Sequence, residues 1–499
     1  MKHKLLSAFV LFTVLTGYAV SCGNGSDSVG SGAAADVSDA ATEAAETAPA
    51  ETEREYLDDL PDGLDFGGVE IRVACQSEGY IDIFLPEQTG EVVDDAKYIR
   101  TSKIEERLNV RLKGIDVGVG WGDYNPVIRK TLSAGDTSYD VVYCWQSFVS
   151  LAYDGLFLDL SDAPYLDISK PYWAKGYLTN MMYDGSKFYF LNGDYCEDIV
   201  RYLSCMYFNK KLYNDIVGDP DGLYRLVIDG GWTWDKMNET ISPYYSDLNG
   251  DGARDTADRY GMELCAYDDS ANDDFIFNMG CEFSYRDETG CPVVDPLGGG
   301  RGEKISGCID RLLTLRASEP VLQLAAEWQD ECAAFREGNI GFVCQYIARA
   351  DQYREMEDDW GILTYPKYDE SQKDYITNIW DAVSLTALPY NCEKRDAICA
   401  VYEAMAAEGS RSVVPVFYET ELKIKYSRDS LTAQVVDILH DTQHSDFAYI
   451  NSSSLKGWKG EIRSMIANGK NNFASWWAKN ESKIQKGLDA IKEASSELK

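Results

Sequence analysis

The chain has 499 residues, 45% of them hydrophobic, which is enough material for two or three domains with a sizeable core. The formal net charge is −36 at neutral pH. A chain this acidic repels nucleic acid and anionic membrane surfaces, so neither is an expected partner. The same charge makes neutral or cationic ligands better candidates than anionic ones.

The first 21 residues have the pattern of an export signal. Lys2 and Lys4 precede an apolar stretch, residues 5–20, that is too short to span a bilayer as a mature helix. Small residues then lead directly to Cys22, and this arrangement resembles a bacterial lipoprotein signal. The resemblance implies that Cys22 receives lipid after cleavage. An ordinary secretory signal that is followed by a cysteine by chance is the alternative.

Residues 22–60 are expected to form a lipid-anchored flexible linker. Between residues 23 and 55 the chain consists almost entirely of Gly, Ser, Ala, Thr, Asp and Glu. Such a composition cannot bury a core, so it favours an extended tether. The globular body is therefore expected at the extracellular face of the bacterial cell membrane, attached by the lipid alone.

Strand and helix patterns alternate in the first part of the body. Strands are predicted at residues 68–74, 109–117 and 139–145, with helices at 96–110 and 124–136. This alternation predicts an α/β unit with a parallel sheet, in which ligands bind beyond the carboxyl ends of the strands. Gln76, Tyr80 and Trp145 follow or end such strands, so we expect them near a ligand.

After residue 190 the pattern becomes mostly helical. A glycine run at 298–302 lacks the register of a phosphate-binding loop and is interpreted as a surface turn. Strand character returns at 340–346 and 378–389, and a helix is predicted at 474–498. Because the α/β pattern is left and then re-entered, we expect two lobes joined by more than one crossing strand.

Several segments, in their order along the chain, resemble the extracellular solute-binding proteins, family 1. They read SYDVVY, GLFLDLSDAP, YFNKKLYND, GGWTWDKMNE, AAFREGNIGFV and GILTYPKYDESQ, and the later EGSRSVVPVFYETELKIKYSRDS is similar to a clostridial-type branch. Members of this family are substrate receptors of carbohydrate ABC importers, with a two-lobed, type II periplasmic-binding-protein-like α/β fold. The resemblance implies lobe I at residues 61–193 and 345–410, and lobe II at 194–344 and 411–499.

Residues 247–258 have the spacing of a calcium-binding loop. Gly252 occupies loop position 6, where the chain must turn sharply. The oxygen donors expected at positions 1, 3, 5, 7, 9 and 12 are Asp247, Asn249, Asp251, the carbonyl of Ala253, Asp255 and Asp258. A solvated acidic turn is the alternative. Since the chain has no second loop of this kind, we predict a structural calcium ion in lobe II rather than a sensor pair.

Sugars stack their C–H faces on aromatic rings and exchange hydrogen bonds with polar side chains. On this basis the expected ligand contacts are Trp145, Asp194, Trp380, Asp381, Gln76, Tyr80 and Gln345. The alternative for the tryptophans is core packing, and for an aspartate after glycine it is a turn cap. Trp232 and Trp234 are interpreted as packing residues at a helix entry.

Enzymatic activity is not expected. The segment HDTQH, residues 440–444, imitates a zinc-protease helix, but Asp441 is shorter than the glutamate required and no third histidine remains. A serine hydrolase would need a G-x-S-x-G turn, which the sequence lacks. A glycosidase needs only a pair of carboxylates. In a chain with 83 acidic residues the presence of such pairs does not indicate a glycosidase.

The expected function is that of a monomeric, lipid-anchored receptor. It would capture a carbohydrate, preferentially an oligosaccharide, between its lobes and deliver it to the permease subunits of an ABC importer. The alternative is a glycan-binding or sensory receptor of the same fold that is not coupled to transport. Besides Cys22 there are twelve cysteines without any C-x-x-C motif, and most are expected to be buried thiols.

Overall fold

A computed structural model describes residues 57–77, 83–265, 270–324, 332–419 and 430–497. All of them belong to one compact unit, residues 54–499. The expected signal peptide, Cys22, most of the linker and Tyr80 lie outside the described residues. Within the described ranges, no helix combines the length and the apolar character that crossing a membrane requires.

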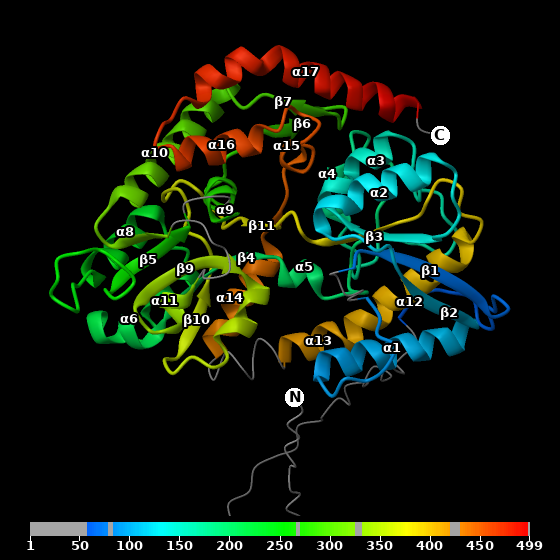
Figure 1. The fold of residues 1–499 in the computed structure, drawn as a ribbon, viewed down its shortest axis with the longest axis horizontal. Coiled ribbons are helices and arrows are strands. Elements are labelled where there is room, and N and C mark those ends of the chain that lie inside the picture. The colour runs from blue at the N-terminus through cyan, green and yellow to red at the C-terminus, as the bar shows by residue number, and fades with distance from the viewer. Residues whose placement is uncertain (1–56, 78–82, 266–269, 325–331, 420–429, 498–499) are drawn as a thin grey trace, which may run out of the picture. The chain divides into compact units, whose positions relative to one another are not determined.

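The first lobe is built on a four-stranded sheet with strand order β12-β3-β1-β2. Its strands are β1 (Val69–Cys75), β2 (Val110–Asp116), β3 (Val141–Trp145) and β12 (Ser384–Ala387). The first three are parallel, and β12 is antiparallel to β3. Helices α1 (Val92–Leu108) and α12 (Arg395–Ser412) lie on one side of the sheet, and α2 (Trp121–Ser133) and α3 (Val149–Tyr153) on the other (Figure 1). The α/β unit predicted from the sequence is confirmed.

The second lobe contains a five-stranded sheet, with strand order β10-β4-β9-β5-β8. The strands are β4 (Ser204–Asn209), β5 (Tyr260–Cys265), β8 (Val321–Leu324), β9 (Ile340–Tyr346) and β10 (Trp360–Leu363). The strand predicted at 340–346 is confirmed as β9. The expectation of a mostly helical segment after residue 190 is wrong in part, because β4, β5 and β8 are short buried runs whose apolar pattern does not distinguish a strand from a helix.

The helices of the second lobe and the short connecting elements complete the fold. They are η1 (Gln146–Phe148), α4 (Lys175–Met181), α5 (Asp198–Arg201), α6 (Lys210–Val217), α7 (Gly222–Ile228), α8 (Trp234–Ile241), η2 (Ser242–Tyr244), α9 (Ser270–Asn278), β6 (Ser284–Arg286), β7 (Pro292–Val294), η3 (Gly298–Gly300), α10 (Arg301–Ala317), α11 (Ala333–Arg336), η5 (Ile347–Tyr353), β11 (Thr377–Asn378), α13 (Val414–Phe417), α14 (Ser430–Asp441), β13 (Gln443–His444), α15 (Phe447–Ile450), α16 (Trp458–Ala467) and α17 (Phe473–Glu497). The predicted glycine turn is η3, where Gly299 and Gly300 have positive φ.

The lobe boundary expected at residue 345 does not match the sheets. Strand β10 pairs with β4 in the second sheet, and the chain rejoins the first sheet only at β12. Two crossing segments run side by side between the sheets, because Leu203 forms a bridge with Ile379 and the Trp380 amide donates to the Tyr202 carbonyl at 3.0 Å. Strand β10 is a short apolar run, and the sequence of such a run does not indicate which sheet the strand joins.

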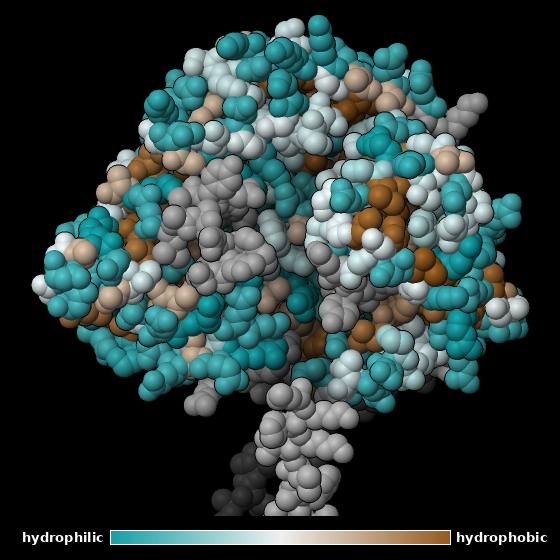
Figure 2. Space-filling view, in the orientation of Figure 1, coloured by the Kyte–Doolittle hydropathy of each residue, from teal (hydrophilic) through white to brown (hydrophobic). Residues whose placement is uncertain are grey.

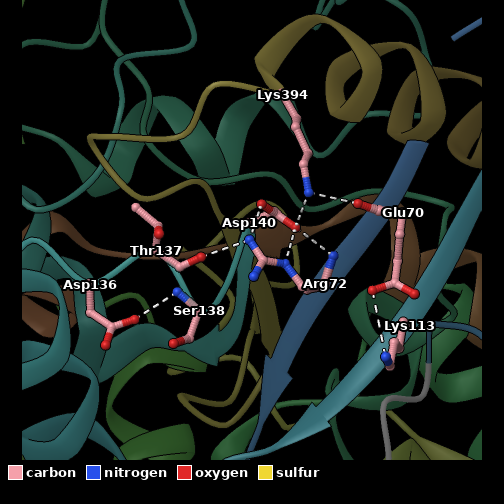
Figure 3. Close-up of polar contacts among 8 residues, drawn as sticks. All are labelled: Glu70, Arg72, Lys113, Asp136, Thr137, Ser138, Asp140 and Lys394. Atoms are coloured by element: carbon pink, nitrogen blue, oxygen red, sulfur yellow. Dashed lines mark hydrogen bonds and ion pairs between the residues drawn. The ribbon is translucent and has the colours of Figure 1, made fainter. Parts of the chain in front are cut away.

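A charge cluster fixes the amino-terminal edge of the first sheet (Figure 3). The Arg72 side chain on β1 donates to both carboxylate oxygens of Asp140 at 2.9 Å, and Lys394 donates to the same carboxylate at 2.8 Å. Burial acts to raise the pKa of Asp140, but the hydrogen bonds from Arg72 and Lys394 outweigh it and lower the pKa. The cluster therefore ties β1, the start of β3 and the start of α12 together.

Two elements contact both lobes. Helix α17 packs against α10 in the second lobe and against α3 in the first (Figure 1). Arg286, on β6, donates to the carbonyls of Thr179 at 2.7 Å and Met182 at 2.9 Å, at the carboxyl end of α4. Helix α4 contacts the first lobe, because the Tyr177 hydroxyl donates to the side-chain oxygen of Gln146, directly after β3, at 3.1 Å. The crossing segments are thus not the sole connection between the lobes.

Hydrophilic side chains cover most of the described surface seen in Figure 2, in keeping with the net charge. The interior is apolar and includes most of the thiols: of the eleven cysteines whose side chains are described, nine are buried. The burial expected for them is confirmed. Trp232 is fully buried and donates to the Thr364 carbonyl at 3.1 Å, and Trp234 begins α8 with its ring buried, so both are packing residues as predicted.

Candidate ligand-binding cavity

A cavity of about 750 Å³ lies between the two sheets. This volume falls in the usual range of small-molecule pockets, roughly 300–1,000 Å³. Its lining comes from the ends of β3 and β9, the crossing segments and the region around α16: Trp121, Trp145, Gln146, Ser147, Tyr202, Tyr346, Arg349, Trp380, Asp381, Ala382, Tyr449, Ile450, Ser452, Ser453, Gly457, Lys459 and Gly460. Residues of both lobes therefore meet at one site.

One wall of the cavity is an aromatic group at the crossing segments. The Trp380 ring stacks on Tyr346, with centroids 4.4 Å apart and planes at 19°, and Tyr202 lies 5.5 Å from Trp380. Trp380 is half-buried, so part of its ring is left to face the cavity. An indole held in this way offers a rigid apolar surface on which a sugar ring can stack.

A second aromatic group comes from the first lobe. The ring centroids of Trp121 and Trp145 lie 4.2 Å apart. Trp145 also stacks on Tyr124, with ring centroids 5.6 Å apart. Tyr124 is held in place because its hydroxyl donates to the Ala74 carbonyl at 2.9 Å. Trp121 is 48% exposed, which is unusual for a tryptophan and fits a binding surface rather than a core.

An ion pair contributes the charged part of the lining. Lys459, on α16, pairs with Asp381, and its ammonium also lies 4.6 Å from the centre of the Tyr449 ring. Burial acts to raise the pKa of Asp381, but the charge and the hydrogen bond of Lys459 outweigh it and lower the pKa. Asp381 is therefore ionised at neutral pH. A carboxylate has about four acceptor sites, so the ion pair leaves capacity for ligand hydroxyls.

Three of the seven predicted ligand residues line this cavity: Trp145, Trp380 and Asp381. The last two lie outside β11 and β12, as adjacent side chains must if both are to face one ligand. Gln76 and Gln345 are buried and do not line the cavity; Gln345 donates to the Cys332 sulfur at 3.6 Å. The contact of each residue with a ligand stays a prediction.

Sequence reasoning missed several cavity residues, notably Trp121, Tyr202, Tyr346 and Lys459. Two signals could have found some of them. Tyr346 ends a predicted strand, as Trp145 does, and Lys459 stands between glycines in the segment GWKG. Trp121 is the first residue of α2 and stands between two glycines, where a large aromatic residue has little core to enter.

Asp194 lies apart from this site, in a second cavity of about 350 Å³. That cavity is also lined by Trp173, Lys175, Ile379 and His444, among others. Burial raises the pKa of the Asp194 carboxyl to about 7. A carboxyl in this environment is neutral in mildly acidic solution and pays a desolvation penalty when it ionises.

We expect Asp194→Asn to stabilise the protein in a pH-dependent way. The folded-state pKa of Asp194 is raised above the usual value of 3.8, so the stability that the neutral carboxyl allows is lost as the pH rises towards 7. Asparagine does not ionise, and at pH 8 the variant should unfold with a free energy higher by about 2–4 kcal/mol. Urea unfolding of both proteins at pH 5 and pH 8 measures the difference. An equal difference at the two pH values would contradict the assignment.

The HDTQH segment does not form a zinc-binding helix. Helix α14 ends at Asp441, and His444 belongs to β13, which pairs with β11. The two histidines are therefore not on successive turns of one helix, as a zinc protease requires. Within the described residues, no three His, Cys, Asp or Glu side chains converge as metal ligands would.

The predicted calcium loop connects η2 to β5. Its carboxylates accept hydrogen bonds from the loop's own backbone: Asp247 from Gly250 at 2.6 Å and from Gly252 at 2.9 Å. The described carboxylates of the loop do not converge as three metal ligands would. One observation still favours an ion, because the Oδ2 atom of Asp258 is buried and has no partner among the described residues. Asp258 occupies the last ligand position of the predicted loop. The bound calcium itself stays a prediction.

Calcium should stabilise the second lobe if the loop binds it. At a free concentration 100 times the Kd, a ligand specific for the folded state adds about 2.7 kcal/mol. We expect a chelator to lower the melting temperature of the wild-type protein and to leave that of Asp251→Ala unchanged. Differential scanning fluorimetry with calcium or chelator measures this. A melting temperature of the wild type that does not respond to either would show that the carboxylates only cap the loop backbone.

Comparison with known proteins identifies the fold. No protein-family model matches the sequence, and no curated protein does. Among solved structures, the cyclic alpha-maltosyl-1,6-maltose binding protein from Arthrobacter globiformis has 15% identity and a TM-score of 0.54, with 86% of this chain and 98% of that chain covered. The galacto-N-biose/lacto-N-biose I-binding protein of the ABC transporter from Bifidobacterium longum has 12% identity and a TM-score of 0.55, with the same shares covered.

The sugar-binding protein MalE from Xanthomonas citri is similar to the same degree, with 10% identity, a TM-score of 0.55, and 86% of this chain and 100% of that chain covered. Identities this low show the fold and not the ligand. The chain has a mixed α/β, two-lobed fold of the type found in periplasmic sugar-binding proteins, as predicted. Its cavity lies between the lobes.

Proposed function

We propose that this protein is an extracellular solute-binding receptor that captures a carbohydrate, preferentially an oligosaccharide, between its lobes. The observation that carries the proposal is the cavity of about 750 Å³, in which aromatic groups of both lobes lie beside an ionised carboxylate. Rings for stacking and acceptors for hydroxyl groups are the two requirements of sugar recognition. The structural neighbours named above, which bind sugars, support the same class of ligand.

A binding screen tests the proposal. Isothermal titration of the full chain with mono-, di- and oligosaccharides should detect at least one sugar, and longer sugars should bind more tightly because two aromatic groups are available. Removing the cavity charge in Asp381→Asn should weaken the binding, while Asp162→Asn, a carboxylate far out on the surface of the first lobe, serves as the control. Absence of binding across a broad panel of sugars would refute the proposed ligand class.

We further propose that Cys22 carries lipid and holds the protein at the extracellular face of the membrane. The support is the apolar stretch that ends in small residues directly before this cysteine. Cys22→Ala should release the protein from the membrane fraction or leave the signal uncleaved. Fractionation and labelling with a radioactive fatty acid measure both effects. A variant that still fractionates with membranes after normal cleavage would show that the anchor lies elsewhere.

Delivery to the permease subunits of an ABC importer is the proposed next step. The neighbour from Bifidobacterium belongs to such a transporter, which supports this role over that of an uncoupled receptor. Deletion of the gene should then abolish uptake of the sugar that the purified protein binds. Uptake that continues at the normal rate would favour the sensory alternative.

A further inference from the structure

Two buried cysteines of the second lobe are in contact. The sulfur atoms of Cys281 and Cys308 lie 3.1 Å apart, which is about 1 Å longer than a disulfide bond of roughly 2.05 Å. Their exposed fractions are 3% and 0%. Other buried thiols contact carbonyl groups instead: Cys75 donates to Ile115 at 3.5 Å, and Cys196 to Gly193 at 3.9 Å.

The positions of both sulfurs are determined by regular structure. Helix α9 ends before Gly280, whose φ of 72° lets the chain reverse so that the Cys281 amide donates to the Ile276 carbonyl at 3.1 Å. Cys308 lies on the buried face of α10, between Ile305 and Leu312. Because α9 and α10 pack against each other, the folded backbone itself brings the two sulfurs together.

We propose that Cys281 and Cys308 form a disulfide bond when the chain folds in an oxidising environment. The bond would join the turn after α9 to α10 across 27 residues of sequence. The proposal does not depend on the ligand of the cavity, since it concerns a different part of the second lobe.

The reaction needs a disulfide as oxidant, supplied by a thiol oxidoreductase or by oxidised glutathione. One cysteine thiolate attacks a sulfur of the donor and forms a mixed disulfide, and one donor thiol leaves. The second cysteine thiolate then attacks the sulfur of the first, and the second donor thiol leaves. The two cysteines lose two protons and two electrons in total, and the donor disulfide gains them.

Burial determines when this exchange can occur. Burial and the adjacent Cys308 thiol raise the pKa of the Cys281 thiol, so the folded protein contains little of the reactive thiolate. Exchange is therefore expected before α10 packs on α9, and the finished bond is shielded from reductants. A protein that folds reduced would stay reduced for as long as it stays folded.

Peptide mapping of the full chain tests the proposal directly. The chain is refolded in a mixture of oxidised and reduced glutathione, its free thiols are blocked with N-ethylmaleimide under denaturing conditions, and the digest is analysed by mass spectrometry. The expected result is a linked peptide pair that contains Cys281 and Cys308. Blocked thiols at both positions, or a link from either cysteine to another partner, would overturn the proposal.

Melting temperatures provide a second test. Oxidised Cys281→Ala and Cys308→Ala should each melt roughly 3–5 °C below the oxidised wild type, beyond any loss seen when all three proteins are reduced. The double variant should show no larger oxidation-dependent loss than either single variant, because each removes the same bond. Cys399→Ala, a buried cysteine of α12, is the matched control and should show none. Oxidation-dependent losses that add in the double variant, or that equal the control, would contradict a shared bond.

Discussion

Trp380→Ala should reduce the affinity for carbohydrate by roughly 30- to 1000-fold, which corresponds to about 2–4 kcal/mol of binding free energy. The physical reason is the loss of the half-buried indole that stacks on Tyr346 and borders the cavity. The unliganded protein should melt within a few degrees of the wild type, because the ring is not enclosed by the core. Fluorescence titration and unliganded melting of the same variant measure both quantities.

Trp232→Ala is the matched control for this prediction. Trp232 is fully buried in the second lobe, and its removal should cost about 3–5 kcal/mol of stability through the cavity it leaves. If Trp380→Ala behaves as this control should, with a much lower melting temperature and an intact affinity, Trp380 is a packing residue. The binding surface would then be centred on Trp121 and Trp145.

Lys97→Met should destabilise the protein by about 3–5 kcal/mol at neutral pH, because it leaves the buried Glu197 carboxylate without its nearest positive partner. The Lys97 ammonium lies 2.6 Å from the Glu197 carboxylate, and the side chains are 4% and 1% exposed. Burial acts to raise the pKa of Glu197, but Lys97 and Arg201 outweigh it and lower the pKa. The pair connects α1 to the chain a few residues before the crossing segment at Tyr202 and Leu203. Urea unfolding measures the loss.

The pH dependence and a double variant separate the charge effect from packing. Since the folded-state pKa of Glu197 is lowered, the stability from the ion pair is present above the unfolded-state pKa of about 4.3 and is lost as the pH falls through the folded value. Lys97→Met should therefore approach the wild type at low pH. Lys97→Met/Glu197→Gln should recover much of the loss at neutral pH. A double variant no more stable than Lys97→Met would show that packing, and not charge, dominates.

The first lobe could be predicted from sequence more completely than the second. Its strands alternate with helices in chain order, so the pattern from β1 to β3 defined a parallel sheet. In the second lobe, β4, β5 and β8 are separated by long helical segments, and β10 joins the sheet from beyond the expected boundary. Short buried strands without alternation carry no information about their neighbours.

The candidate site shows the same limit. Trp145 ends β3, and Asp381 lies shortly after the end of β11, so a rule about strand ends was enough to find them. Lys459 comes from α16 and pairs with Asp381 across 78 residues of sequence, a distance at which local patterns do not act. Asp194 was expected at the ligand because it lies near a crossing segment. Cavities lie on more than one side of that segment, and Asp194 lines a different cavity from Trp380.

Helix α17 limits the way in which a ligand can enter. It has 25 residues, which gives a length of about 37 Å, and its hydrogen-bonded backbone resists stretching. Because it contacts α10 in one lobe and α3 in the other, and because Arg286 holds the end of α4, the lobes can part little along this rim. Separation should be greatest along the rim opposite α17. We therefore expect a ligand to enter and leave the cavity from one side only. An oligosaccharide would then be released with one end first.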